Sequence, residues 1–211
     1  IYYKSWKLGL KGQTVYRDGC RKGVIVSTDK IEQTEDDFKD VRAPKRSIEL
    51  PADYYTVYDK KKCYSILIGL MNNRPYEIFI ISDITGLPEI LDDNKIKGII
   101  RKEMKDVYLF EADSYDFIIP NLQDAEHDEK ELGLMLSTML RHGVPLKFLI
   151  KTLNKTKPIA GSFTYKLIKI LSKYIPNGEE TGEKCPDCGA KIRYENGCKR
   201  CSNPDCGYSA C

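Results

Sequence analysis

The sequence contains no long hydrophobic run. None of its 211 residues lies in a stretch that approaches the roughly 20 apolar residues needed to cross a bilayer, and the N-terminus lacks the layout of a signal peptide. We therefore expect a cytoplasmic chain with no membrane partner. Because the first residue is Ile1 rather than Met, we also expect a truncated or processed chain, or one half of a split gene.

The sequence also lacks an excess of one charge. It has 34 basic and 31 acidic residues, a formal net charge of +3, so no strong field favours nucleic acid or an anionic membrane as its partner. The chain has 211 residues, of which 41% are hydrophobic. This is enough for one medium-sized domain and an appendage.

Cysteine is abundant but unevenly placed. Two of the eight cysteines, Cys20 and Cys63, are isolated, whereas the other six fall within the last 27 residues. A secreted scaffold would distribute its disulfides along the chain. A tail of paired cysteines in an otherwise core-forming chain is instead typical of a metal site or of reactive thiols.

The N-terminal region predicts a helix, a strand and then a polar linker. Residues 1–12 fit the end of an amphipathic helix, since Trp6 and Leu10 lie four positions apart, and residues 13–17 fit a short strand. A helix followed by a strand is half of a βαβ unit, which belongs in an α/β sheet. Residues 28–46 are polar and charged, with few apolar anchors, and predict a linker.

Residues 47–175 predict an α+β domain in which strands precede helices. Segments rich in β-branched and aromatic residues predict a three-stranded antiparallel meander, after which shorter strands follow. The strands are expected at 54–58, 63–70, 75–82, 96–102, 106–111 and 115–119.

Three helices are expected after these strands. The first covers 124–142, the second runs from Pro145 to about Leu153, and the third begins after Ser162, a candidate N-cap, and stops at Pro176. The first helix carries an apolar stripe at helical spacing. Its members are Leu132, Met135, Leu136, Met139 and Leu140.

The end of the chain predicts a metal-binding module on a tether. Residues 176–184 (PNGEETGEK) predict a flexible tether, and the cysteine tail, 185–211, follows it. Cys185 and Cys188 form a C-x2-C pair, a turn that supplies two of the four tetrahedral sulfur ligands that zinc prefers. A second cysteine pair would complete a zinc ribbon.

Two assignments of the second ligand pair are open. If Cys201 and Cys206 are ligands, Cys198 and Cys211 are left as a spare pair. If Cys198 is a ligand in place of Cys206, then Cys206 and Cys211 are left instead. The first assignment is favoured, because a glycine follows Cys206 just as one follows the second cysteine of the first pair.

Either assignment leaves two cysteines outside the metal site, one of them the last residue, Cys211. Spare thiols can exchange with another disulfide through a mixed disulfide. Lys199 and Arg200 adjoin Cys198 and would lower the pKa of a nearby thiol. The spare pair is therefore a candidate catalytic redox dithiol. The alternatives are two inert thiols or two further metal ligands.

Residues 5–21 read SWKLGLKGQTVYRDGCR. This pattern resembles the last part of the catalytic barrel of ribonucleotide reductase large chains, with Cys20 where that family has serine. Reductases that receive their radical from a separate subunit carry a Tyr-Tyr pair where this sequence has Val15 and Tyr16. The sequence thus resembles the class that generates its radical with adenosylcobalamin.

Later segments resemble the same class. Those resembling its small accessory domain are 42–51 (RAPKRSIELP), 75–80 (PYEIFI) and 134–153 (LMLSTMLRHGVPLKFLIKTL). The tail, 185–211, resembles the cysteine-rich end of these enzymes. Residues 83–120 resemble no part of the family that we recognise.

The resemblance implies an enzyme that reduces ribonucleoside di- or triphosphates to deoxyribonucleotides for DNA synthesis. In such enzymes a thiyl radical activates the ribose, and two active-site cysteines reduce the 2′-carbon and become a disulfide. The tail thiols would then reduce that disulfide and be recharged by an external reductant, such as a thioredoxin-like protein. Residues 1–27 would form the terminal segment of the barrel.

The implied cofactors are zinc in the tail and adenosylcobalamin in the full enzyme. The implied partners are the remainder of the reductase chain, the nucleotide substrate, the reductant and a possible second copy of the chain. Most of the active site would lie in the remainder of the reductase, so this part is not expected to be active alone.

Two other functions for the tail are open. Zinc ribbons also bind nucleic acid, but residues 184–211 hold only five basic and three acidic residues, a weak positive balance for phosphate contacts. Only Tyr194 and Tyr208 offer rings for base stacking there. A ribbon that joins subunits of an oligomer is compatible with the reductase interpretation.

Overall fold

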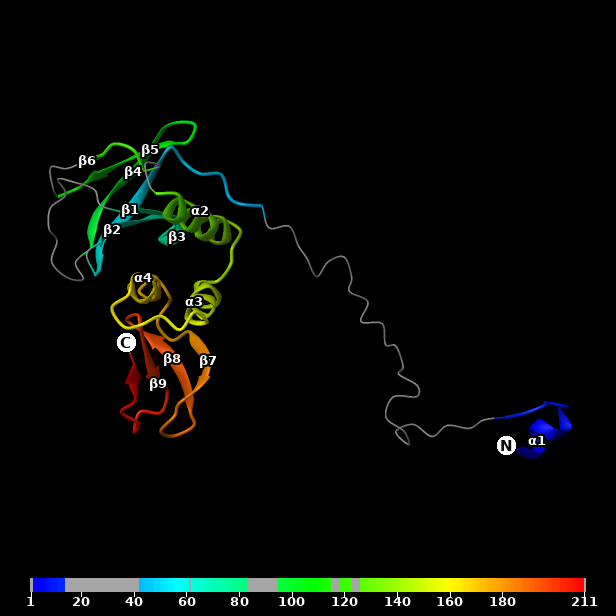
Figure 1. The fold of residues 1–211 in the computed structure, drawn as a ribbon. Coiled ribbons are helices and arrows are strands. Elements are labelled where there is room, and N and C mark those ends of the chain that lie inside the picture. The colour runs from blue at the N-terminus through cyan, green and yellow to red at the C-terminus, as the bar shows by residue number, and fades with distance from the viewer. Residues whose placement is uncertain are drawn as a thin grey trace. The chain divides into compact units, whose positions relative to one another are not determined.

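The computed structural model describes residues 2–13, 42–60, 62–82, 95–114, 118–122 and 126–210. The chain divides into two compact units, Ile1–Asp40 and Val41–Cys211 (Figure 1). In the first unit, helix α1 covers Tyr2–Lys7 and ends near Gly9, whose φ is +68°. The predicted strand after it and most of the predicted linker lie outside the described residues, as does Cys20, and the end of a catalytic barrel is not seen.

The described part of the second unit begins with an antiparallel sheet of the order β3-β2-β1-β4-β5-β6. The predicted meander is confirmed, because β1 pairs with β2 and β2 with β3. Asn72 and Asn73, in the β2–β3 turn, both have positive φ, as a tight hairpin requires. The strands are β1 Glu49–Asp59, β2 Lys62–Met71, β3 Arg74–Ser82, β4 Ile96–Met104, β5 Val107–Ala112 and β6 Ile118–Ile119.

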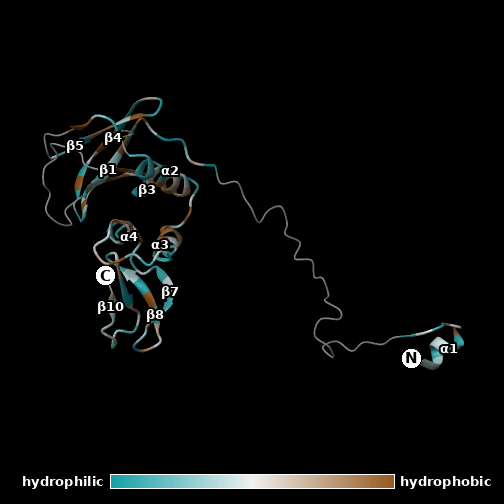
Figure 2. Cartoon of the chain, in the orientation of Figure 1, coloured by the Kyte–Doolittle hydropathy of each residue, from teal (hydrophilic) through white to brown (hydrophobic). Residues whose placement is uncertain are grey.

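The sheet has a core on each face, because successive side chains of a strand point to opposite sides. Tyr55 and Val57 pack with the helices on one face, whereas Tyr54, directly before Tyr55, packs on the other face. Figure 2 shows hydrophobic residues along the strands of this sheet. The α+β class predicted from the sequence is therefore confirmed, as a sheet with helices on one side.

Helix α2, His127–Arg141, covers the edge of the sheet at β3 (Figure 1). Leu136 and Leu140 of the predicted stripe are buried, whereas Met135 is 60% exposed. The residues that approach β3 are small. A Cβ at Gly133 would lie 3.0 Å from the carbonyl oxygen of Ile78, and the Ser137 hydroxyl bonds both to the N–H and to the carbonyl oxygen of Ile78.

Replacing Ser137 with alanine should therefore destabilise the domain. The substitution leaves two backbone groups of Ile78 buried without a partner, which costs about 1–3 kcal/mol. Urea unfolding of the chain should show this loss. Thr138→Ala is the matched control, because the Thr138 hydroxyl is exposed and bonds only within its own helix; an equal loss in both variants would contradict the role of Ser137.

The end of the predicted linker is fixed to the sheet. Arg46 makes three hydrogen bonds to the carboxylate of Glu77, of 2.7 to 3.1 Å, and Arg141 of α2 donates to the same carboxylate at 3.0 Å. Glu77 is fully buried, and a buried carboxylate needs such partners. The last residue of the predicted linker, Arg46, is therefore attached to the sheet and is not part of a freely solvated linker.

Two further helices connect the sheet to a second, smaller sheet. They are α3, Leu146–Asn154, and α4, Phe163–Ser172. Ser162 caps α4, as predicted, by accepting from the N–H of Tyr165 at 3.3 Å. The small sheet has the order β10-β9-β8-β7 among the described residues. Its strands are β7 Glu180–Lys184, β8 Lys191–Glu195, β9 Cys198–Cys201 and β10 Ser209–Ala210; we call residues 180–210 the ribbon.

The predicted tether at 176–184 is wrong. Five of its residues form β7, the outermost strand of the ribbon. The residues before it are also held, since Asn177 accepts from the N–H of Asn196 at 2.7 Å. Tyr194 of β8 is buried in the same core as α4. The ribbon is thus packed against the helices and does not swing on a tether of its own.

No helix in the described ranges is both long and apolar enough to cross a membrane.

Candidate metal centre

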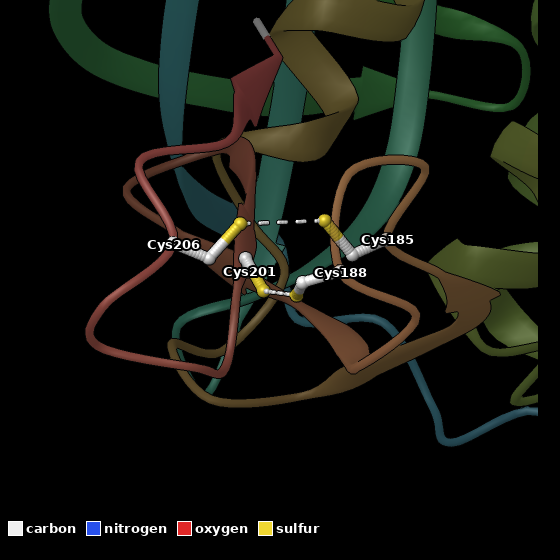
Figure 3. Close-up of side chains that lie close together, drawn as sticks. All are labelled: Cys185, Cys188, Cys201 and Cys206. Atoms are coloured by element: carbon white, nitrogen blue, oxygen red, sulfur yellow. Dashed lines mark hydrogen bonds between the residues drawn. The ribbon is translucent and has the colours of Figure 1, made fainter.

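Four cysteine sulfurs gather at one end of the ribbon (Figure 3). The sulfurs of Cys185, Cys188, Cys201 and Cys206 all lie within 4.8 Å of one another. The Cys185 and Cys206 sulfurs are 3.7 Å apart, and those of Cys188 and Cys201 are 3.4 Å apart. Figure 3 shows that all four side chains point to a common centre.

Two turns bring these sulfurs together. In the first, the N–H of Gly189 donates to the carbonyl oxygen of Cys185 at 2.9 Å, and the N–H of Cys185 donates to Ala190 at 2.7 Å. Gly189 has a φ of +75°, which favours glycine at this position. In the second turn, the N–H of Cys206 donates to the carbonyl oxygen of Asn203 at 3.1 Å.

The spacing of the sulfurs fits a tetrahedral zinc ion. Four sulfurs about 2.3 Å from a central zinc ion would be about 3.8 Å from one another. The two sulfur–sulfur distances, 3.7 and 3.4 Å, are close to this value. The donor set of four cysteines is also the one that structural zinc sites use.

The four thiols differ in their tendency to ionise. The backbone N–H of Ala190 donates to the Cys188 sulfur and lowers the pKa of this exposed thiol to about 7. Burial raises the pKa of Cys201 to about 12. A bound cation would favour the thiolate form of both, because a metal displaces the protons of its ligands.

The structure gathers the four cysteines of the favoured assignment and leaves Cys198 out of the group. Cys198 is half-buried at the start of β9 and is disulfide-bonded. Cys206, a member of the alternative redox pair, lies in the four-sulfur group instead. Cys211 lies outside the described residues. Cys63 lies in β2, opposite Tyr58 and outside the ribbon.

The two cations beside Cys198, Lys199 and Arg200, are paired with carboxylates that were not expected from the sequence. The Lys199 ammonium bonds to the Glu183 carboxylate at 2.7 Å, and Arg200 pairs with Glu195 at 3.0 Å. These carboxylates offset the cations that were expected to lower a thiol pKa. The sequence could have indicated Glu195, which faces Cys198 across the β8–β9 hairpin, but not Glu183, because β7 was not recognised.

The same ion pairs bear on nucleic-acid binding. Lys191 also pairs with an acidic residue, Glu180, at 2.8 Å. Three of the five basic residues counted in the tail are thus neutralised by neighbouring carboxylates, which reduces their attraction for phosphate.

Two comparisons identify relatives. A family model described as "NrdJ homologue C-terminal domain" matches residues 50–176, well over half of the chain. A vitamin B12-dependent ribonucleotide reductase of Streptantibioticus cattleyicolor is 49% identical over 35 residues, which are 17% of this chain and 6% of that protein. No solved structure matches the chain.

The family match ends at residue 176, before the ribbon begins. The match covers the six-stranded sheet and the three helices after it, apart from the first residue of β1. Both comparisons agree with the resemblance to the C-terminal region of adenosylcobalamin-dependent ribonucleotide reductases, and the chain therefore belongs to the NrdJ homologue C-terminal domain family.

Proposed function

We propose that this chain is the electron-delivering C-terminal part of an adenosylcobalamin-dependent ribonucleotide reductase, an enzyme that makes deoxyribonucleotides for DNA synthesis. One observation carries the proposal: a chain of this family has a disulfide-bonded cysteine, Cys198, next to but outside a four-sulfur cluster. A dithiol that can open and close while a metal holds the surrounding fold is suited to repeated electron transfer.

In this proposal Cys185, Cys188, Cys201 and Cys206 hold a structural zinc ion. The support is the spacing of their sulfurs and the small size of the ribbon core. Apart from cysteines, that core contains one buried residue, Ile192, with Ala190 and Tyr208 packed against it. A core of this size needs a metal or disulfides for stability.

The redox pair is Cys198 and Cys211. Five other cysteines, Cys63 and the four of the cluster, carry thiols, which leaves Cys20 and Cys211 as partners for Cys198. In the ribbon, Ser209 pairs with Arg200 and Ala210 with Lys199. If this antiparallel register continued by one residue, Cys211 would lie opposite Cys198, and this supports Cys211 as the partner.

The chemical step is a thiol–disulfide exchange. A thiolate of the reduced pair attacks the active-site disulfide and forms a mixed disulfide, and the second tail thiol then displaces the active-site thiol. Two electrons and two protons pass to the active site, and the tail pair becomes a disulfide. An external dithiol restores the tail by the same exchange and is itself oxidised.

Adenosylcobalamin would supply the radical that begins ribose reduction, and we assign none of the described residues to its binding. Residues 1–27 would close the catalytic barrel, so the remaining active site, the substrate and the radical chemistry belong to the rest of the enzyme. Because the ribbon packs on α4, the part that moves between the active site and the reductant would be the whole unit Val41–Cys211.

Thiol mapping tests this assignment on the isolated chain. After zinc loading, an alkylating reagent should label Cys198 and Cys211 only after mild reduction, and mass spectrometry should then show both labels with one zinc ion per chain retained. Labelling of Cys198 before reduction, or loss of zinc on reduction, would contradict a redox pair that is independent of the metal site. Cys63 is the internal reference thiol, since it is not in the cluster.

A further inference from the structure

The stretch of sequence that contains α3 and α4 has no acidic residue. From 132 to 178 the sequence has no Asp or Glu, although the whole chain has 31. The same stretch carries seven lysines, which are Lys147, Lys151, Lys155, Lys157, Lys166, Lys169 and Lys173. The small net charge of the chain therefore conceals one strongly basic region.

Helical spacing places these lysines in two rows. Residues three and four apart lie on one face of a helix, so one row follows α3 to its C-cap, Lys155, and a second follows α4 to its C-cap, Lys173. The two helices contact each other, and both adjoin the ribbon (Figure 1). We call residues 146–173 the basic hairpin.

Several of these ammonium groups face solvent. Lys151, Lys155 and Lys157 are exposed and make no ion pair within the described ranges. The neighbouring carboxylates lie at the margins of the hairpin. Glu179 pairs with Lys147 at 3.0 Å, and Asp59 accepts from the N–H of Phe163, the first residue of α4.

The basic hairpin adjoins the cysteine that we assign to the redox pair. A Cβ at Gly197 would lie 3.2 Å from the Cα of Lys173, so the β8–β9 turn packs on the end of α4. Cys198 follows Gly197 directly. Cys198 therefore lies near the end of α4, so a protein that exchanges thiols with it would come close to the lysines of that helix.

We propose that the basic hairpin is the docking surface for an acidic protein, the dithiol reductant that recharges the tail. This proposal rests on the redox function proposed for Cys198. Opposite charge on a partner speeds the encounter and orients the attacking thiolate. Exposed apolar side chains among the lysines, Phe148 at 52% and Ile159 at 81%, also suit a protein surface.

A protein fits this surface better than a nucleic acid does. Two rings beside these lysines are unavailable for stacking on bases, because Tyr55 is buried and the Lys169 ammonium lies over the ring of Tyr165, 5.2 Å from its centroid. Single-stranded nucleic acid depends on such rings as well as on charge.

The test compares a triple variant, Lys151→Gln, Lys155→Gln and Lys169→Gln, with the unchanged chain. The probe is a bacterial thioredoxin of net negative charge, and the measurement is the second-order rate constant for reduction of the Cys198 disulfide at low and high ionic strength. We expect about a tenfold lower rate constant for the variant at low ionic strength, and a weaker salt dependence. Reduction by an uncharged small dithiol should be unchanged.

A second triple variant controls for general loss of charge. Lys97→Gln, Lys105→Gln and Lys130→Gln remove three exposed lysines away from the hairpin and should leave the thioredoxin rate within about twofold. Equal rates for the hairpin variant and the unchanged chain, or an equal loss in the control, would overturn the docking proposal. The redox function would survive that result.

If neither reductant opens the disulfide, the redox function fails and binding decides the docking proposal separately. A thioredoxin with both reactive cysteines replaced by serine should still bind the unchanged chain at low salt, and bind the hairpin variant about tenfold more weakly. No difference in this binding would overturn the proposal. Tight, salt-sensitive binding of a single-stranded oligonucleotide, lost in the hairpin variant, would assign the surface to nucleic acid instead.

Discussion

Cys198→Ser is expected to reduce turnover of the complete reductase by about a hundredfold or more when a protein dithiol supplies the electrons. A serine cannot form the mixed disulfide through which the exchange proceeds, so the active-site disulfide would persist after the first reduction. Single-turnover experiments should still show one deoxyribonucleotide formed per pre-reduced active site. The defect thus lies in re-reduction, and the steady-state rate separates it from the chemical step.

A small dithiol provides the decisive comparison for this variant. It can reach the active-site disulfide without the tail, so Cys198→Ser should retain turnover with the small dithiol, and Cys211→Ser should behave in the same way. Cys63→Ser is the matched control, because that thiol lies in β2, away from the ribbon. If Cys198→Ser turned over normally with the protein dithiol, Cys198 would have no part in the relay.

The sheet was largely predictable because its signals are local. The strands around Tyr55, Ile66 and Ile78 are rich in β-branched and aromatic residues, and an Asn-Asn pair separates the second from the third. The pairing of β1 with β4 was not predictable, because it joins residues more than 40 positions apart through a segment without a recognisable pattern. Such pairings depend on tertiary packing rather than on local preference.

The errors in the helical part have the same cause. A count of apolar positions placed Met135 in the core, whereas the real contact with β3 is made by Gly133 and Ser137, which allow close approach of the backbone.

Strand β7, of sequence ETGEK, is hydrophilic because it lies at the edge of the ribbon (Figure 2). Its composition therefore predicted a tether.

At the candidate metal centre, the spacing of the cysteines predicted a four-sulfur cluster but left the choice between Cys198 and Cys206 open. That choice depends on the β8–β9 register, in which Cys201 pairs with Ile192 and Cys198 with Glu195. Cys198 and Cys201 are consequently at opposite ends of the same short strand. Spacing along the sequence could not reveal this separation.

Replacing Cys201 with alanine should release the zinc ion and unfold the ribbon while the larger sheet stays folded. Cys201 is 4% exposed and belongs to the ribbon core, and structural zinc ions contribute about 10–16 kcal/mol of apparent binding energy to small folds. The six-stranded sheet has cores of its own. Metal analysis should show a fall from one zinc ion per chain to none, and hydrogen exchange should show lost protection over residues 180–210 only.

A fall in pH should also release the zinc ion. Zinc binding displaces protons from the thiols, and the Cys188 thiol titrates at about 7 and Cys201 at about 12 without metal. As the pH falls below 7, zinc must also displace a proton from Cys188, and the apparent zinc affinity decreases. A competing chelator should therefore remove zinc more readily at pH 6 than at pH 8. Cys63→Ala is the control and should behave like the unchanged chain in the metal analysis and in the chelator experiment. If Cys201→Ala kept its zinc ion and its protection from hydrogen exchange, Cys201 would not be a ligand.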